Sequence, residues 1–447
     1  MNQFTKMRRS KAIAGAAGMM ALTASSWGQT ADALIDKLVE KGILNVKEAN
    51  QLREESDKGF NQAYSVKSGM PDWVTSFKIN GDFRGRYESF TYDNNTVDRD
   101  RFRYRARLGF TAVMQENFEV GLRLASGDLD GGVPTGGIDP ISTNQTLQNN
   151  ASKKGVFLDL AYAKWSPLNT RDWTGSLTFG KMENPFVFPS TMMFDRDYTP
   201  EGGALELALR AGDQHTLKLT GAGFILDELA ADSNDPFMAA GQVRWDAVWS
   251  PKFSSSLGAS VWRITSPGVL VNGAVPNISS GNTRVGAAGT LVNDYNPIQA
   301  DVSLTYTVEK VPLYPVAFPI TVFGEVLRNP GAVTKNMGYG FGVMLGKSGK
   351  KGQWDFSYQY RYLEGDAWYE ELPESDFGAN YITAAPGGSA GYRSGTNVKG
   401  HIFRGQYTPW DMLTFSVTYF LTDLIDPNPA GSASGTGRLQ VDAVIKF

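Results

Sequence analysis

The chain has 447 residues, with no cysteine, two histidines and a formal net charge of −3 at pH 7. The absence of cysteine excludes disulfide bonds, thiolate metal sites and a cysteine nucleophile, and two histidines leave little material for zinc or triad chemistry. The nearly balanced charge supplies no broad basic surface, which argues against nucleic acid as a partner.

Residues 1–28 are predicted to be a secretory signal peptide. Four basic residues without an acidic one precede a small apolar stretch at 12–24, and Ser25, Ser26 and Gly28 follow it. The apolar stretch is too short to span a bilayer as a stable helix, and we expect cleavage between about residues 26 and 30. The mature chain is therefore predicted to be exported.

Residues 29–71 are predicted to form a short periplasmic helical segment and a linker. Residues 31–41 place Leu34, Ile35, Leu38 and Val39 on one helical face, and Gly42 stands where a helix would end. This apolar stripe is too small to fold alone. It is either a frayed appendage or a contact between sister subunits, and we favour the contact.

Residues 72–447 are predicted to form a transmembrane antiparallel β-barrel. After the signal peptide the sequence has no run of 18 apolar residues, which excludes a helical membrane protein. In residues 77–88 apolar residues and glycine alternate with Lys, Asn, Asp, Arg and Glu. This period of two is typical of a strand with one apolar face and one polar face. The same alternation predicts sixteen strands: 77–88, 101–110, 118–124, 156–165, 175–182, 203–210, 215–224, 239–249, 254–264, 298–308, 319–327, 338–346, 353–363, 400–408, 412–421 and 437–447.

The predicted connections alternate in length. Short links at 115–117, 211–213, 250–252, 347–352 and 408–411 are separated by long ones at 126–154, 183–201, 265–297, 364–398 and 422–436. Short periplasmic turns and long outer loops are typical of an outer-membrane barrel. The links at 166–174 and 309–317 are longer than expected for the short side. The alternative, a soluble multi-domain β protein, rarely sustains such long amphipathic strands.

The barrel is expected to close on itself. In lipid every backbone N–H and C=O needs a partner, so the last strand has to pair with the first. The chain stops within a strand, on the aromatic residue Phe447. Sixteen strands also leave room for a water-filled lumen.

The sequence resembles the putative porins of Gram-negative outer membranes, which are akin to the sixteen-stranded general diffusion porins. The resemblance rests on residues 38–44, on Phe179-Gly180-Lys181 leading into the third long loop, on residues 195–202 closing that loop, and on Phe447. It implies an outer-membrane location and passive diffusion of small hydrophilic solutes and ions. It further implies a homotrimer, and recognition of the terminal Phe447 by the barrel-assembly machinery.

Two groups of charged residues are the candidate site. Strand parity brings seven arginines to one patch of the lumen: Arg84, Arg86, Arg101, Arg103, Arg105, Arg107 and Arg123. In a general porin the third long loop would fold inward, and here it supplies Glu183, Asp195, Asp197 and Glu201. A cationic wall that faces an acidic loop would set ion preference by its field, and we hypothesise a preference for anions. Arg196 in the loop weakens this division, and the alternative is a solvated wall balanced by Asp82, Glu88 and Glu119.

Enzymatic and metal-binding interpretations find little support. Gly346-Lys347-Ser348 lacks the first glycine of a phosphate-binding loop, because Phe341 stands at that position. The acidic runs at 98–100 and 128–131 lack the spacing of a known calcium loop. We expect no enzyme, cofactor or metal site. The alternatives to a general porin are a substrate-specific channel, for phosphate or another anion, and a non-conducting barrel with an adhesive or structural role.

Overall fold

The computed structural model describes residues 70–93, 98–128, 139–230, 233–277, 280–378, 395–426 and 434–447. The chain divides into two units, residues 1–77 and 78–447. The predicted signal peptide, and the predicted helical segment except its last two residues, lie outside the described residues. No helix in the described part of the chain is long and apolar enough to cross a membrane.

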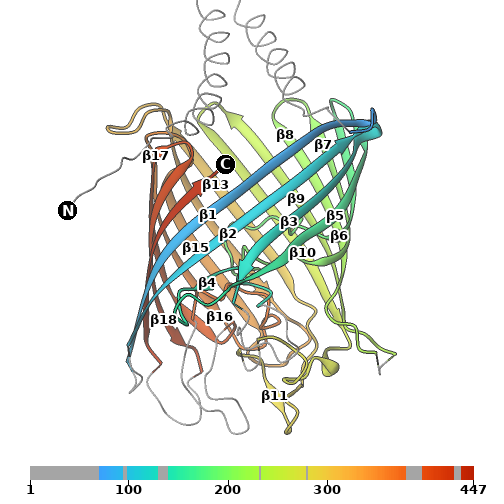
Figure 1. The fold of residues 1–447 in the computed structure, drawn as a ribbon, viewed down its shortest axis with the longest axis vertical. Helices are drawn as coiled ribbons and strands as arrows, with labels where there is room; N and C mark the ends of the chain where they lie inside the picture. The colour runs from blue at the N-terminus through green and yellow to red at the C-terminus, as the bar shows by residue number, and fades with distance from the viewer. Residues whose placement is uncertain are drawn as a thin grey trace, which may run out of the picture. The chain divides into compact units, whose positions relative to one another are not determined.

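Sixteen antiparallel strands of the described chain form a closed barrel, which confirms the predicted fold and strand number (Figure 1). A further strand, β4 (Gln145–Thr146), pairs with Arg103 and Tyr104 near the start of β2, and a small hairpin of β11 (Arg284–Val285) and β12 (Thr290–Leu291) lies in a long loop. The barrel strands are β1 (Val74–Tyr92), β2 (Arg99–Met114), β3 (Phe118–Gly127), β5 (Gly155–Asn169), β6 (Trp173–Lys181), β7 (Glu201–Ala211), β8 (His215–Ile225), β9 (Phe237–Ser250), β10 (Phe253–Thr265), β13 (Ile298–Val308), β14 (Phe318–Arg328), β15 (Met337–Gly346), β16 (Gln353–Leu363), β17 (Val398–Trp410), β18 (Leu413–Leu424) and β19 (Thr436–Lys446).

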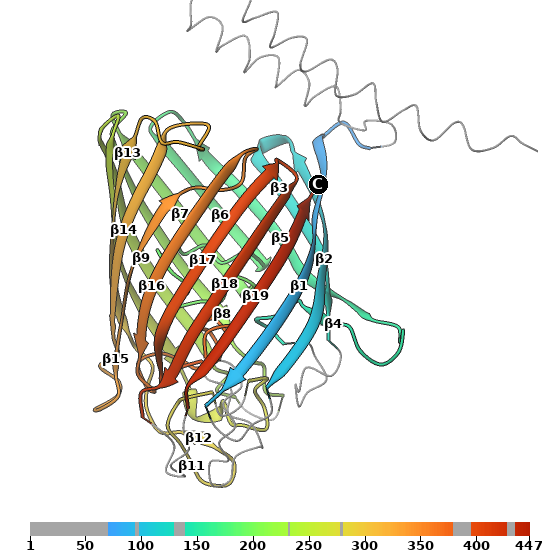
Figure 2. The same ribbon diagram turned by 90° about the vertical axis from the view of Figure 1, so that its left-hand side faces the viewer.

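The last strand pairs with the first, as predicted. β19 runs antiparallel to β1 from Asp82 opposite Lys446 to Tyr92 opposite Thr436, and the two strands lie side by side in Figure 2. The terminal residue completes the pairing: Gly81 N–H donates to the Phe447 carbonyl at 2.9 Å, and Phe447 N–H donates back at 3.1 Å. The ladder therefore has no open edge, which is the condition for a sheet in lipid.

Long and short connections alternate around the barrel. At one end of the barrel the links follow β2, β5, β7, β9, β13, β15 and β17, and all but the link 309–317 have at most six residues. At the other end the links after β3, β6, β8, β10, β16 and β18 have eleven or more residues, whereas those after β1 and β14 are shorter. The link predicted at 166–174 shrinks to 170–172 because β5 continues, with an irregular register after Trp165, to Asn169. The link at 309–317 keeps its predicted length.

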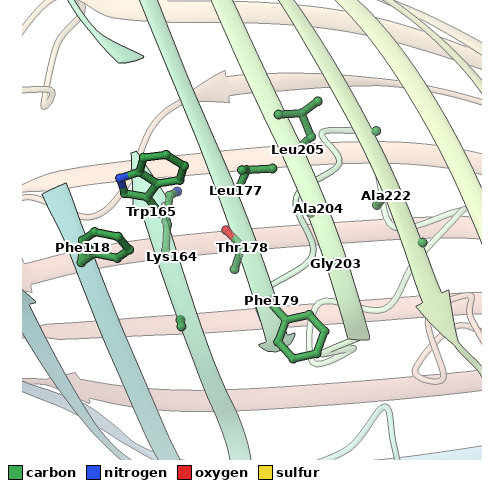
Figure 3. Close-up of a pocket in the computed structure, with 13 residues that line it drawn as sticks. Phe118, Lys164, Trp165, Leu177, Thr178, Phe179, Gly203, Ala204, Leu205 and Ala222 are labelled. Atoms are coloured by element: carbon green, nitrogen blue, oxygen red, sulfur yellow. The ribbon is translucent and has the colours of Figure 1, made fainter. Parts of the chain in front are cut away.

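The outer face of the barrel is apolar and the inner face is polar. On β1, Phe83 is 47% exposed on the outside, whereas the neighbouring Asp82 and Glu88 are buried inside. Figure 3 shows part of the outer face, where aromatic and leucine side chains surround a shallow apolar groove over strands β3 to β8. An exposed apolar surface of this extent fits a lipid environment. The side chains labelled there include Phe118, Trp165, Leu177, Phe179 and Leu205.

A hydrophobic cluster fills part of the lumen. Inward-facing side chains of β8, β9 and β10 pack against the loops after β6, β10 and β16. Trp262 of β10 lies at the centre of the aromatic contacts, with ring centroids 4.5 Å from Phe186 and 5.5 Å from Trp368. The Trp368 indole N–H donates to the Met193 carbonyl at 2.8 Å. These loops are therefore packed elements of the interior, held by burial of apolar surface.

Gly180 lets the chain leave β6 in the direction of the lumen. Its φ is 117°, and a Cβ atom there would lie 2.3 Å from the Ala161 carbonyl oxygen of β5. A substitution would therefore strain the backbone and push β5 and β6 apart.

Gly180→Ala is expected to destabilise the barrel by about 1–3 kcal/mol, because both the positive φ and the carbonyl contact oppose a side chain. The measurement is the thermal unfolding temperature of the detergent-solubilised protein by circular dichroism. Gly85→Ala in β1 is the matched control, since a Cβ there meets nothing within 4 Å. Equal unfolding temperatures for the two variants would contradict this role of Gly180.

Candidate functional site

The loop after β6, residues 182–200, lies inside the barrel. Val187 exchanges two hydrogen bonds with the Gln242 side chain of β9, at 3.0 and 2.9 Å. Further along, the Thr191 hydroxyl accepts a hydrogen bond of 2.8 Å from Arg361 of β16. Contacts with strands this far apart in the barrel carry the loop across the lumen, so it narrows the free cross-section.

A second loop also enters the lumen, and the sequence analysis did not foresee it. Asp376, in the loop after β16, forms ion pairs with Arg86 of β1 at 3.1 Å and with Arg438 of β19 at 2.7 Å. Burial alone would raise the pKa of Asp376, but the guanidinium groups of Arg438 and Arg86 outweigh it and lower the pKa below its ordinary value. Asp376 is therefore a charged anchor that holds this loop against β1 and β19.

The two loops are joined at Asp195. Its carboxylate accepts hydrogen bonds from the backbone N–H of Asp197 at 2.8 Å and from the N–H of Ser375 at 3.0 Å, and its own N–H donates to the Leu372 carbonyl at 2.8 Å. Burial, reinforced by the negative charge of Asp197, raises the pKa of Asp195 well above its ordinary value. Asp195 therefore connects the loops more than it supplies a free negative charge.

Three of the seven predicted arginines pair with Glu88 or Asp442. Glu88 is fully buried, and its carboxylate lies 2.5 Å from Arg101 and 3.9 Å from Arg103. Arg86 donates two parallel hydrogen bonds to Asp442 of β19, at 2.7 and 2.8 Å. Arg84, the next inward residue on β1, donates a hydrogen bond of 2.5 Å to the Asn144 side chain instead.

Arg105 and Arg107 share two carboxylates between the wall and the loop. Asp82 lies 2.9 Å from Arg105 and 2.7 Å from Arg107. Asp197 of the loop lies 3.0 Å from Arg105 and 3.6 Å from Arg107. The sequence analysis expected the acidic loop to face the cationic wall, and the structure brings the two into direct ion pairs.

Glu183 pairs with the arginine wall, whereas Glu201 does not. Glu183 forms an ion pair with Arg123, which also pairs with Asp159 of β5. Glu201 is the first residue of β7 and lies on the same face as the exposed Leu205, where it pairs with Lys181 at 3.1 Å. The structure thus places Glu201 on the outer face, away from the acidic group with which the sequence analysis placed it. The reason is that β7 begins at Glu201, two residues before the predicted strand, so that Glu201 belongs to the strand and points outward like Leu205.

A polar cavity of about 280 Å³ remains between the loops and the wall formed by β1, β2 and β16 to β19. Six arginines and five carboxylates line it. The positive residues are Arg84, Arg86, Arg105, Arg107, Arg196 and Arg404, and the negative residues are Asp195, Asp197, Glu374, Asp376 and Asp442.

Three of these arginines are poorly neutralised. Within the described residues Arg84 and Arg196 have no carboxylate within ion-pair distance, and Arg404 has only Asp355 at 3.9 Å. Arg404 was missed by the sequence analysis, although its inward parity on β17 could have shown it. The cavity therefore has a small positive excess and can attract anions through fixed charges.

Three solved structures match this chain over most of its length. OprB of Pseudomonas putida, in its high-pH structure, matches with 10% sequence identity, a TM-score of 0.52, and coverage of 83% of this chain and 94% of that chain. OmpF of Salmonella typhi, in complex with daunomycin, matches with 12% identity, a TM-score of 0.47, and coverage of 85% and 99%. The outer-membrane channel DcaP of Acinetobacter baumannii matches with 13% identity, a TM-score of 0.44, and coverage of 86% and 99%. No curated protein matches the sequence.

The closed sixteen-stranded barrel is the fold that this chain shares with OprB, and here the loops fold into a charged lumen. The model of the putative porin family matches residues 88–266, from the end of β1 through β10. This match includes the loop inside the lumen and confirms the resemblance that the sequence analysis stated. The match spans less than half of the chain.

Proposed function

We propose that this porin passes small hydrophilic solutes and ions along the β1, β2 and β16 to β19 side of its lumen, with a weak preference for anions. The observation that supports it is the cavity on that side, where no described carboxylate lies within ion-pair distance of Arg84 or Arg196 and Arg404 has only Asp355 at 3.9 Å. The opposite side of the lumen is partly filled by the hydrophobic cluster around Trp262. A field from a few unpaired charges favours anions without selecting one solute.

The test is the reversal potential of the purified channel in a planar bilayer under a dilute KCl gradient, where screening is weak. A modest anion preference is expected. Asp197→Asn should increase the chloride-to-potassium permeability ratio, roughly two-fold for one unit charge about 8 Å from the ion path, because Arg105 and Arg107 lose a shared partner.

Glu201→Gln is the matched control, since it removes the same charge from the outer face and should leave the ratio unchanged. Cation preference of the unmodified protein, or equal effects of the two variants, would contradict the proposal. A complete absence of single-channel steps would favour an adhesive or structural barrel.

We propose that the working unit is a homotrimer of mature chains in outer-membrane lipid, with residues 1–28 removed and residues 29–71 in the periplasm. The apolar outer face supports association with lipid and with sister subunits. Native mass spectrometry of the detergent-solubilised protein should give three times the mass of a chain that begins between about residues 27 and 31. A monomer, or a chain that retains Met1, would contradict this.

We further propose that Phe447 serves the barrel-assembly machinery as well as the barrel. It ends β19, is 66% exposed, and its ring covers Gly81 of β1. Phe447→Ala should reduce the amount of urea-resistant protein in the outer membrane, whereas Phe415→Ala, at a 48% exposed outward position in β18, should not. Equal membrane levels for the two variants would contradict a special role of the terminus.

A further inference from the structure

The three poorly neutralised arginines come from three separate parts of the barrel. Arg84 lies on β1, Arg196 on the loop after β6, and Arg404 on β17, yet all three line the same cavity. Like charges brought together in this way repel each other, and a fold retains them at a cost unless something compensates. Their convergence therefore calls for an explanation beyond barrel stability.

The carboxylates that line the cavity are already engaged. Asp197 forms ion pairs with Arg105 and Arg107, and Asp442 accepts hydrogen bonds from Nε and Nη2 of Arg86. The remaining acids are also paired within the loops or with the wall: Asp376 with Arg86 and Arg438, Glu374 with Arg361 at 3.7 Å and the Thr191 hydroxyl, and Asp195 with Ser375 and the Asp197 N–H. No described carboxylate is thus left to neutralise Arg84 or Arg196.

Two of the three arginines also carry an unsatisfied donor. The Nε atoms of Arg84 and Arg404 are buried and have no hydrogen-bond partner in the described structure. A buried donor without a partner is unfavourable by about 1–3 kcal/mol, more for a charged group, and such groups are uncommon in folded proteins. An anion that accepts from Nε and the neighbouring Nη atom in the forked geometry of a guanidinium would remove this penalty.

The rest of the cavity wall suits a polar solute. Uncharged side chains of β16 to β19 line it, among them Gln359, Gln406 and Thr418. Amide and hydroxyl groups can donate to or accept from hydroxyl groups on a solute. An anionic group at the arginines would therefore leave the remainder of a small solute against hydrogen-bonding side chains.

We propose that Arg84, Arg196 and Arg404 form a binding site for the carboxylate or phosphate group of a small solute inside the channel. The site rests on the proposed function, since it requires solutes to enter this side of the lumen. It goes beyond a general anion preference, because it requires the directional donors of guanidinium groups and not only their charge. Binding is expected to be saturable and weak enough to allow release.

The test uses single-channel recording in dilute KCl, with inorganic phosphate or acetate added as the probe. At least one probe should reduce the chloride current in a saturable way, and the comparison of the two shows whether the site takes phosphate or carboxylate groups. Arg84→Gln and Arg404→Gln should each raise the half-blocking concentration about tenfold, the loss of one charge-assisted hydrogen bond.

Two further variants separate the site from the general field. Arg404→Lys keeps the charge but lacks the forked donors of a guanidinium. The variant should therefore retain the anion preference of the channel and still need a higher probe concentration for half block. Lys164→Gln is the control for charge, because Lys164 pairs with Glu206 and does not line this cavity. Its half-blocking concentration should equal that of the unmodified protein.

Several results would overturn the site. If neither probe gives saturable block while the reversal potential shows anion preference, the site fails and the proposed function stands. If the half-blocking concentrations of Arg84→Gln and Arg404→Gln equal that of the unmodified protein, the probe binds elsewhere. Cation preference of the unmodified channel would overturn the proposed function and the site with it.

Discussion

The structure depends on one constraint: in lipid, every backbone N–H and C=O of the barrel has to find a partner within the protein. The pairing of β1 with β19 meets it, down to the hydrogen bonds between Gly81 and Phe447. Closure also fixes the parity of every strand, because a shift by one residue would turn each side chain to the other face. The positions of the arginines inside the lumen follow from this, since they occupy alternate residues of β1 and β2.

Two kinds of contact organise the interior: apolar packing and ion pairs. Apolar packing around Trp262 fills one side of the lumen and holds the loops in place. Ion pairs attach the loops to the opposite wall. Asp197 of one loop pairs with an arginine of β2, and Asp376 of the other loop pairs with arginines of β1 and β19. Most of the wall's positive charge is used in these attachments. The few cavity-lining arginines that do not attach a loop to the wall remain available to a passing solute.

Much of the fold could be predicted because it is encoded locally. Alternation with a period of two gave all sixteen strands, and connection lengths gave the two ends of the barrel. The inward position of the arginines on β1 and β2 followed from the same alternation. Glu201 was misplaced because the start of β7 is set by pairing with Lys181, which the local pattern at the strand end does not reveal.

The missing part of the site depends on contacts between residues distant in sequence. Asp376 lies in a loop whose composition does not show that it enters the lumen, and its partners Arg86 and Arg438 are far away in the chain. Arg404 belongs to the site only because the pairing of β19 with β1 brings β17 to the same side of the barrel as β1. The ion pairing of the acidic loop with the wall is likewise a property of tertiary packing, so a charge pattern alone predicted a field between separated groups.

The central claim is that solutes pass along one side of the lumen, between the loops and the wall of β16 to β19, β1 and β2. Because the chain has no cysteine, single-cysteine variants test it directly. Gln406 lines the cavity on the open side, and Gln299 is 0% exposed on the filled side. The measurement is the loss of single-channel current after a small charged methanethiosulfonate reagent is added. The account predicts that Gln406→Cys loses current and Gln299→Cys does not, and the reverse pattern would contradict it.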